Sequence, residues 1–345
     1  MKRALFPTLA VLLGMAVALL AAEWALRTFD LGPLSRAPAP MAVDPDLIFH
    51  QHDPDPVVGY TMRPGKEGKM QNLPTRINQH GCRGDEPTGE GPLVVALGDS
   101  ITFGAGVHEA QAFPALVAGE LARRERPVRM LGCGVSGYNL EQMMARYDRD
   151  LAPLAPSLIL LNLFADDLSP AYVLQDRSFT SWLRFRSALF RAVERSKLWP
   201  GTGNRPVPSW ARDQREYGQA MLERLTTFIR RHRADGTQFL AITHPLLGTP
   251  LHGTAGPLEQ LVMLAAKEGV PVLRMRPVYA EATDGDILSL SINPGGKDPH
   301  PNPGGHRLIA EQIVNAIVDG DLLDPTNRPP SAPIADRALP DEPAV

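Results

Sequence analysis

The sequence predicts an α/β protein: a three-layer α/β/α sandwich with a five-stranded parallel sheet, preceded by one N-terminal transmembrane helix. Three observations predict it. Five short apolar runs are continuous, as in strands covered on both faces, and helical patterns alternate with them. A longer apolar stretch follows a basic start. Parallel neighbours need crossover connections, and the alternating helices supply them.

Residues 1–30 form the predicted membrane segment. Lys2 and Arg3 precede an apolar run over residues 4–22, which is long enough to cross a hydrocarbon core of about 30 Å as a helix. Because the basic residues come first, the positive-inside rule places the N-terminus in the cytoplasm and the remainder outside it. This pattern predicts a single-pass protein of the inner (cytoplasmic) membrane with its main domain on the periplasmic side.

Cleavage of this segment would instead release the protein as a secreted form. Ala21 and Ala22 are small, but Leu19 and Leu20 stand two positions before them, so the small-x-small pattern of a signal peptidase site is poor. The sequence therefore favours an uncleaved anchor.

Three further regions follow the membrane segment. Residues 31–91 are rich in Pro, Asp, Gly and Gln and predict a spacer and an irregular collar, with short strand-like pieces at 57–62 and 75–78. The main domain spans residues 92–320. Residues 321–345 are acidic and Pro-rich with few large apolar side chains, so they predict a disordered tail.

Within residues 92–320, strands and helices are expected in alternation. The apolar runs lie at 93–97, 128–131, 158–163, 238–243 and 270–273, and the helical patterns at 112–124, 140–150, 212–233, 258–268 and 304–318. Residues 170–210 interrupt the alternation as a variable insert. Its segment from Trp182 to Leu198 has an amphipathic helical pattern, which fits either a cover over the site or a satellite core.

The net charge limits the kinds of partner the protein can have, and the cysteine content limits its disulfides. A formal net charge of -3 gives no basis for nucleic-acid binding, which needs clustered Lys and Arg. The two cysteines, Cys82 and Cys133, predict no disulfide framework. Cys133 follows an apolar run and is expected to be a small buried side chain. A bond between the two is permitted outside the cytoplasm, but it is not the favoured expectation.

Ligands of parallel sheets bind at the carboxyl ends of the strands, and Gly98-Asp99-Ser100 stands at the end of the first apolar run. On its own, the tripeptide fits a helix cap better than a catalytic site. A serine hydroxyl attacks an ester only when a base takes its proton and an acid orients that base. Partner residues are therefore required.

The C-terminal region supplies such partners. Asp298 stands two residues before His300 on a segment that three prolines stiffen, so its carboxylate can reach one imidazole nitrogen while the other faces the pocket. A metal site built from Asp298, His300 and His306 is the competing interpretation. No further His, Cys or carboxylate cluster stands beside them in the sequence, so we predict no metal and no cofactor, with a structural role for His306.

The third requirement is a set of donors for the negative oxygen that forms on the attacked carbonyl. Residues 134–139 follow the second apolar run, and a glycine there, Gly137, can turn its amide N–H toward Ser100. Asp166 and Asp167 follow the third run. These polar residues are expected at the same edge of the sheet.

In this order, the motifs resemble the SGNH (GDSL-like) hydrolase superfamily. The resemblance spans residues 76–318 and implies a flavodoxin-like SGNH hydrolase fold. It also implies that Ser100 is the nucleophile, His300 the base and Asp298 the orienting acid. The amide groups of Ser100 and Gly137, together with the position of Asp166, correspond to the oxyanion hole.

The flanking sequence is similar to membrane-anchored bacterial members of that superfamily, notably over residues 77–84 and 300–306. Two features differ from the usual family pattern. One residue rather than two separates the acid and the base. Asp166 stands where the family has asparagine, and an ionised carboxylate cannot donate to an oxyanion. Asp166 is then protonated, or backbone donors suffice, or the chain is a weak or inactive relative. Asn162 is the alternative donor if the register differs.

The expected function is a serine esterase or deacylase that hydrolyses carboxylic esters through an acyl-enzyme. Its expected substrates are small-molecule or glycan esters, including O-acetyl groups on extracytoplasmic glycans or lipids, and its other partner is the membrane. Two alternatives stay open: a polysaccharide O-acetyltransferase that uses the same residues, and a catalytically weak, membrane-tethered binding module. The sequence does not indicate the oligomeric state.

Overall fold

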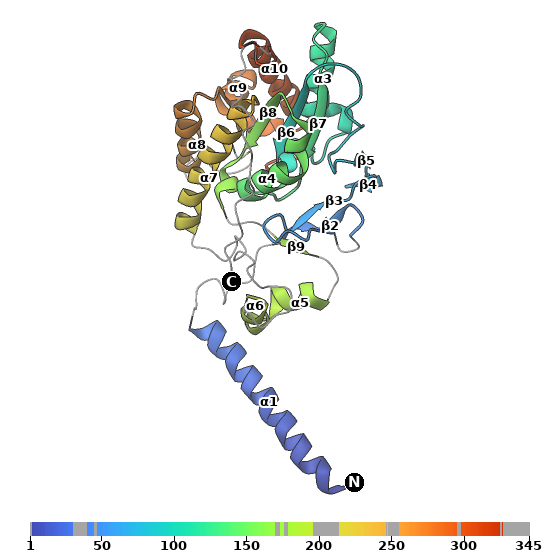
Figure 1. Ribbon diagram of the computed structural model, residues 1–345, viewed down its shortest axis with the longest axis vertical. Helices are drawn as coiled ribbons and strands as arrows, with labels where there is room; N and C mark the ends of the chain where they lie inside the picture. The colour runs from blue at the N-terminus through green and yellow to red at the C-terminus, as the bar shows by residue number, and fades with distance from the viewer. Residues whose placement is uncertain are drawn as a thin grey trace.

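The structure is a computed structural model of the 345-residue chain. It describes residues 2–29, 40–44, 47–169, 173–175, 179–195, 214–245, 247, 255–294, 298–324 and 326. The predicted α/β/α sandwich is confirmed: a five-stranded parallel sheet lies between two layers of helices, and a long N-terminal helix projects from the domain (Figure 1).

All five predicted strands are present within a few residues of the apolar runs. They are β6 (Leu93–Gly98), β7 (Arg129–Gly134), β8 (Leu158–Leu163), β10 (Gln238–Thr243) and β11 (Val272–Arg274). Their order in the sheet is β11-β10-β8-β6-β7, with every pairing parallel. This is the flavodoxin-like order, and the strand order reverses between β6 and β8. A ligand site is therefore expected where these two strands end.

Alternate side chains of the sheet supply two separate cores. On β6, Leu93, Val95 and Leu97 face one core, whereas Val94 and Ala96 face the other. The helices of the first layer are α4 (Leu140–Arg146), α7 (Gln214–Ala234) and α8 (Ala255–Lys267), and those of the second are α3 (Phe113–Arg123), α9 (Met275–Ala282) and α10 (Pro303–Asp319). Burial on both faces explains why the strands are continuous apolar runs in the sequence.

Short helical elements occupy several connections. These are α2 (Ser100–Phe103), η2 (Glu109–Gln111), η3 (Tyr147–Leu151), η4 (Ala152–Leu154), η5 (Ala165–Leu168) and η7 (Ile287–Leu290). Two of them, α2 and η5, follow directly on β6 and β8 and so stand at the edge where the strand order reverses.

The collar contains two small antiparallel hairpins. The first pairs β2 (His50–His52) with β3 (Tyr60–Met62), and the second pairs β4 (Glu67–Met70) with β5 (Leu73–Arg76). Strand β3 begins three residues later than the predicted piece at 57–62, and β5 lies two residues before the predicted piece at 75–78. The Tyr60 hydroxyl donates to the Ser136 carbonyl at 2.8 Å. The collar therefore packs against the loop that follows β7, at the carboxyl edge of the sheet.

The insert forms two helices rather than the single helix expected from Trp182 to Leu198. They are α5 (Phe179–Arg186) and α6 (Ala188–Arg195), and residues 196–198 lie outside the described part of the chain. The Ser187 hydroxyl accepts from the Phe190 amide at 3.0 Å, which is the bond of a serine N-cap and starts a new helix. Before this hairpin, β9 (Val173–Gln175) pairs in parallel with β1 (Pro40–Val43).

The N-terminal helix α1 (Lys2–Thr28) is long and apolar enough over Ala10–Thr28 to cross a membrane, a property shared by anchors and signal sequences. At the other end, Leu322 is buried in the core on the α10 side of the sheet, so the chain stays packed beyond α10. Of the predicted tail over residues 321–345, the structure describes residues 321–324 and 326, and the others lie outside the described residues.

Candidate active site

The structure brings together three residues that the sequence singled out. His300 Nε2 lies 2.8 Å from Ser100 Oγ, and His300 Nδ1 lies 2.8 Å from Asp298 Oδ1. The imidazole and the carboxylate remain 23% and 32% exposed, so a substrate can reach them. A hydroxyl, an imidazole and a carboxylate joined in this order form the arrangement that activates a serine for attack on an acyl group.

Ser100 is placed by the turn that leads out of β6. Asp99 Oδ1 accepts from the Ile101 amide at 2.9 Å, so Asp99 caps the short helix α2 and Ser100 becomes its first residue. The capping interpretation therefore holds for Asp99 while the Ser100 hydroxyl bonds to His300. A Cβ at Gly98 would overlap the Thr102 hydroxyl, so the missing side chain lets α2 pack directly on the end of β6.

The base and its acid are held by one short loop. Asp298 Oδ1 accepts from the backbone amide of His300 at 2.9 Å as well as bonding to its ring. The His300 carbonyl accepts from the Ile292 amide at 3.0 Å, and the Ser291 hydroxyl donates to the Asp298 carbonyl at 2.9 Å. These bonds fix the two side chains relative to each other despite the single intervening residue.

Asn302 connects the base to the last helix. Its side-chain oxygen accepts from the amides of Gly304 and Gly305 at 2.9 and 3.1 Å, which caps α10, and its side-chain nitrogen donates to the Ser289 carbonyl at 2.8 Å. The final helix therefore begins three residues after His300 and anchors the loop that carries it.

The expected oxyanion donors lie in the turns after β6, β7 and β8. Gly137 is buried, and its φ of 78° is in the region that glycine adopts without strain. Neither the Ser100 nor the Gly137 amide has an acceptor among the described residues, so both N–H groups are available to a ligand. Asp166 belongs to η5, but its side chain lies outside what the structure describes.

Asn162, the alternative donor, instead faces the interior. It is buried and its Oδ1 bonds to His244 Nε2. Burial lowers the pKa of His244 to about 3, so the ring is neutral, donates to Asn162 and accepts from the Tyr279 hydroxyl at 3.3 Å. Sequence reasoning missed this network, because each of its members is a single polar residue within an otherwise apolar pattern.

His306 is fully buried, and its Nδ1 accepts from the Phe113 amide at 3.3 Å. Burial lowers its pKa to about 3. The burial of His306 and its bond to the Phe113 amide indicate a packing role. Within the described ranges no group of three or more His, Cys, Asp or Glu side chains is arranged to hold a metal ion.

Arg83 is a second residue that sequence reasoning missed, although it lies within the motif at residues 77–84. Its buried guanidinium donates to the carbonyls of Phe103, Gly104 and Val107 at 2.9, 2.7 and 2.9 Å. These are the carbonyls at and just beyond the end of α2. Burial lowers the pKa of Arg83, and the cation binds where the helix end carries partial negative charge. Arg83 thus supports the helix that presents Ser100.

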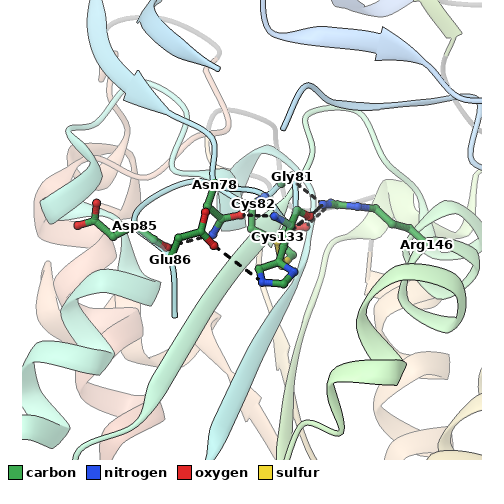
Figure 2. Close-up of a disulfide and its surroundings, with 8 residues drawn as sticks. Asn78, Gly81, Cys82, Asp85, Glu86, Cys133 and Arg146 are labelled. Atoms are coloured by element: carbon green, nitrogen blue, oxygen red, sulfur yellow. Dashed lines mark hydrogen bonds and ion pairs between the residues drawn. A yellow bond between two sulfur atoms is a disulfide. The ribbon is translucent and has the colours of Figure 1, made fainter. Parts of the chain in front are cut away.

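The expectation that no disulfide is present was wrong. Cys82 and Cys133 are bonded, with their Cα atoms 4.3 Å apart (Figure 2). The Arg83 amide donates to the Gly132 carbonyl at 3.1 Å, so the collar pairs with the edge strand β7 and brings Cys82 beside Cys133. Spacing in the sequence gives no sign of this pairing, because it depends on how the collar folds back.

Arg146 reinforces the same junction. From α4, its guanidinium donates to the carbonyls of Gly81 at 2.7 Å, His80 at 3.1 Å and Cys133 at 3.2 Å, as Figure 2 shows in part. Both sides of the disulfide are therefore bound to one buried cation.

The model of the GDSL-like Lipase/Acylhydrolase family matches residues 96–308, which include Ser100, Gly137 and His300. No curated protein sequence matches the chain significantly.

Several solved structures are similar at low identity. An α/β hydrolase enzyme from the metagenome of Lake Arreo, Spain, is 18% identical, with a TM-score of 0.43, over 69% of this chain and 99% of that one. The acetylxylan esterase Axe2 from Geobacillus stearothermophilus is 14% identical, with a TM-score of 0.44, over 66% and 95%. A lipase/acylhydrolase from Enterococcus faecalis is 16% identical, with a TM-score of 0.45, over 68% and 98%.

Proposed function

Because this chain belongs to the GDSL-like lipase/acylhydrolase family and is an ester-hydrolysing enzyme, we propose that it is a serine esterase that works through an acyl-enzyme on Ser100. One observation carries the proposal: the continuous hydrogen-bonded chain from Ser100 through His300 to Asp298, with 2.8 Å at each step. Such a chain serves no evident packing purpose at a partly exposed edge of the sheet.

The three residues divide the proton transfers and the bond-forming steps among them. His300 takes the proton from Ser100 as its oxygen attacks the acyl carbon, and the same proton passes to the departing alcohol. A water molecule, deprotonated by His300, attacks the acyl-enzyme and releases the carboxylic acid and free Ser100. Asp298 holds the protonated nitrogen of His300 and stabilises the imidazolium that forms in both steps.

For the oxyanion, we assign the amide N–H groups of Ser100 and Gly137 as donors. This assignment is supported by the fact that neither N–H group has an acceptor among the described residues. Asp166 stands at the position of a third donor and, when ionised, contributes none. Loss of one oxyanion donor slows catalysis by about a hundredfold or more, so an enzyme with two backbone donors is slow rather than inactive.

The proposed location is the inner membrane, with the catalytic domain on the periplasmic side. Lys2 and Arg3 support this orientation, since positive charge stays on the cytoplasmic side. The Cys82–Cys133 bond supports it independently, because disulfides persist in oxidising compartments. An uncleaved anchor is supported by α1 itself, which continues as a helix through Ala22 to Thr28.

This location makes O-acylated glycans or lipids outside the cytoplasm the proposed substrates. Acyl transfer to a polysaccharide needs the same three residues and differs only in the acceptor that attacks the acyl-enzyme. A tethered binding module would keep the pocket without turnover. Both alternatives are outcomes of the same experiment.

The experiment measures hydrolysis of p-nitrophenyl acetate by the full-length protein in nanodiscs. We expect Ser100→Ala to lower kcat by about a thousandfold or more, while Ser136→Ala, a serine in the neighbouring turn, retains activity. An added acetyl-acceptor glycan that captures the acetyl group in preference to water would identify a transferase. Absence of turnover in wild type would identify the tethered binding module. Measurable turnover that is equal in wild type and Ser100→Ala would contradict the serine mechanism.

A further inference from the structure

The end of α1 and the α5–α6 hairpin share one polar junction. Glu23 accepts hydrogen bonds from the amides of Ala188 and Leu189 at 2.9 and 2.7 Å and from the Ser187 hydroxyl at 2.8 Å. A carboxylate in this position caps α6, where the N-terminal end of the helix carries partial positive charge. Arg27, one turn further along α1, pairs with Glu23 at 2.6 Å.

The sequence places this junction at the end of the apolar part of α1. The apolar run ends at Ala22, and Glu23 is the first charged residue after it. A charged side chain is costly inside the hydrocarbon core, so in a membrane-spanning α1 the core boundary falls at about Ala22. The hairpin is therefore fixed to α1 where the hydrocarbon ends and the headgroup layer begins. Figure 1 shows it between α1 and the remainder of the domain.

The hairpin also exposes aromatic side chains. Phe179 and Trp182 are 71% and 55% exposed, and their rings stack with centroids 5.8 Å apart. They stand one helical turn apart on α5. Trp24 on α1 and Phe29 just after its end are exposed to a similar degree, 63% and 67%. Exposure of this kind does not fit a satellite core, whereas Trp at a membrane interface is common.

Basic groups accompany these rings. Arg27 and Arg186 are exposed, and the Arg27 guanidinium also bonds to the Arg186 carbonyl. Aromatic rings beside cations suit a layer in which apolar chains meet anionic headgroups. A pure protein partner would not account for the position of the hairpin at the end of the apolar run.

We propose that the α5–α6 hairpin lies in the headgroup layer of the membrane that α1 spans, with Phe179 and Trp182 inserted at the interface. The inference rests on the proposed membrane anchor. It goes beyond anchoring, because it gives the domain a second contact with the lipid surface. The collar and hairpin lie on the carboxyl-edge side of the sheet, so this contact holds the edge that bears Ser100 toward the bilayer (Figure 1).

The test uses the full-length protein in nanodiscs of phosphatidylcholine and phosphatidylglycerol. Both native cysteines are in the disulfide, so an introduced cysteine is the one thiol available to an environment-sensitive fluorophore. Trp182→Cys and Phe179→Cys place the probe on the hairpin. Met263→Cys places it on α8, where the native side chain is 64% exposed, and serves as the control.

We expect spin-labelled lipids to quench the probe at residues 182 and 179 at least several-fold more than the probe at residue 263, with a blue-shifted emission at the hairpin. Equal quenching at all three positions would overturn the proposal. Alkaline carbonate extraction distinguishes a failure of the membrane anchor from a failure of the hairpin contact. Release of the chain would refute both the anchor and the hairpin contact, whereas an anchored chain with an unquenched hairpin probe would refute only the contact.

Hydrolysis of p-nitrophenyl acetate by the same labelled samples provides the remaining control. Retained hydrolysis shows that the labelled variants are folded. If the wild-type protein is inactive but the hairpin probes are quenched, the proposed esterase function fails and the lipid contact stands.

Discussion

Cys82 in the collar is disulfide-bonded to Cys133, the residue before the last in β7, four positions ahead of Gly137. The bond ties the collar to the strand that leads into one of the assigned oxyanion turns. Arg83, next to Cys82, donates to the Phe103 carbonyl at the end of α2. The segment before the sheet is therefore part of the support of the active site rather than a mere spacer.

Removal of this bond should destabilise the domain. The two cysteines are 51 residues apart, and a loop of that size corresponds to about 4 kcal/mol of chain entropy in the unfolded state. We expect the Cys82→Ala/Cys133→Ala protein to unfold at a clearly lower urea concentration than wild type. Wild type treated with a reductant should shift in the same direction. An unchanged midpoint in both would contradict the structural role of the bond.

Arg83→Met should weaken the support of α2. The substitution keeps an unbranched, apolar stem but removes three hydrogen bonds from a buried cation, so we expect a loss of about 3 kcal/mol in unfolding free energy and a lower kcat. Arg123→Met, on the exposed end of α3, is the matched control and should change neither. Full activity in Arg83→Met would show that α2 holds Ser100 without the guanidinium.

Stability should fall in mildly acidic solution. Burial lowers the pKa of His244 and His306 to about 3 from an ordinary value of 6.5. Between these values the unfolded chain binds protons that the folded protein does not, so stability is full above pH 6.5 and is lost as the pH decreases. Each group contributes up to about 1.4 kcal/mol per pH unit.

Urea unfolding at several pH values between about 4 and 8 measures this slope. The His306→Gln protein lacks one of the two groups, so its free energy of unfolding should depend less steeply on pH than that of wild type. The same slope in both proteins would mean that His306 does not contribute.

Asp166→Asn should accelerate hydrolysis. Asparagine can donate to the oxyanion where an ionised carboxylate cannot, and a restored donor raises kcat by up to about a hundredfold. Asp284→Asn removes a carboxylate from an exposed turn and should leave kcat unchanged. A lower kcat in Asp166→Asn would indicate that the carboxylate itself serves the reaction.

Much of this arrangement could be predicted from the sequence. Strands buried on both faces are visible as apolar runs, and the rule that parallel strands present ligands at their carboxyl ends places Ser100 and Gly137 at one edge. Ser100 and His300 are 200 residues apart, so their contact followed from the order of motifs and not from spacing. Proline-stiffened residues around His300 made its local pairing with Asp298 predictable.

Other features depend on long-range packing that no local pattern reveals. The disulfide and the role of Arg83 require the collar to pair with the edge of β7. Ser187 divides the insert into two helices because Glu23, more than 160 positions earlier, caps the second one. Neither contact has a periodic signal in the sequence.

The central claim is that Ser100 is the nucleophile, and covalent labelling by a fluorophosphonate probe tests it most directly. We expect about one probe per protein, located by peptide mass on the segment that contains Ser100, and absent in Ser100→Ala. We also expect much slower labelling in His300→Gln, since the base is lost. Labelling that persists in Ser100→Ala, or that maps to another serine in wild type, would contradict it.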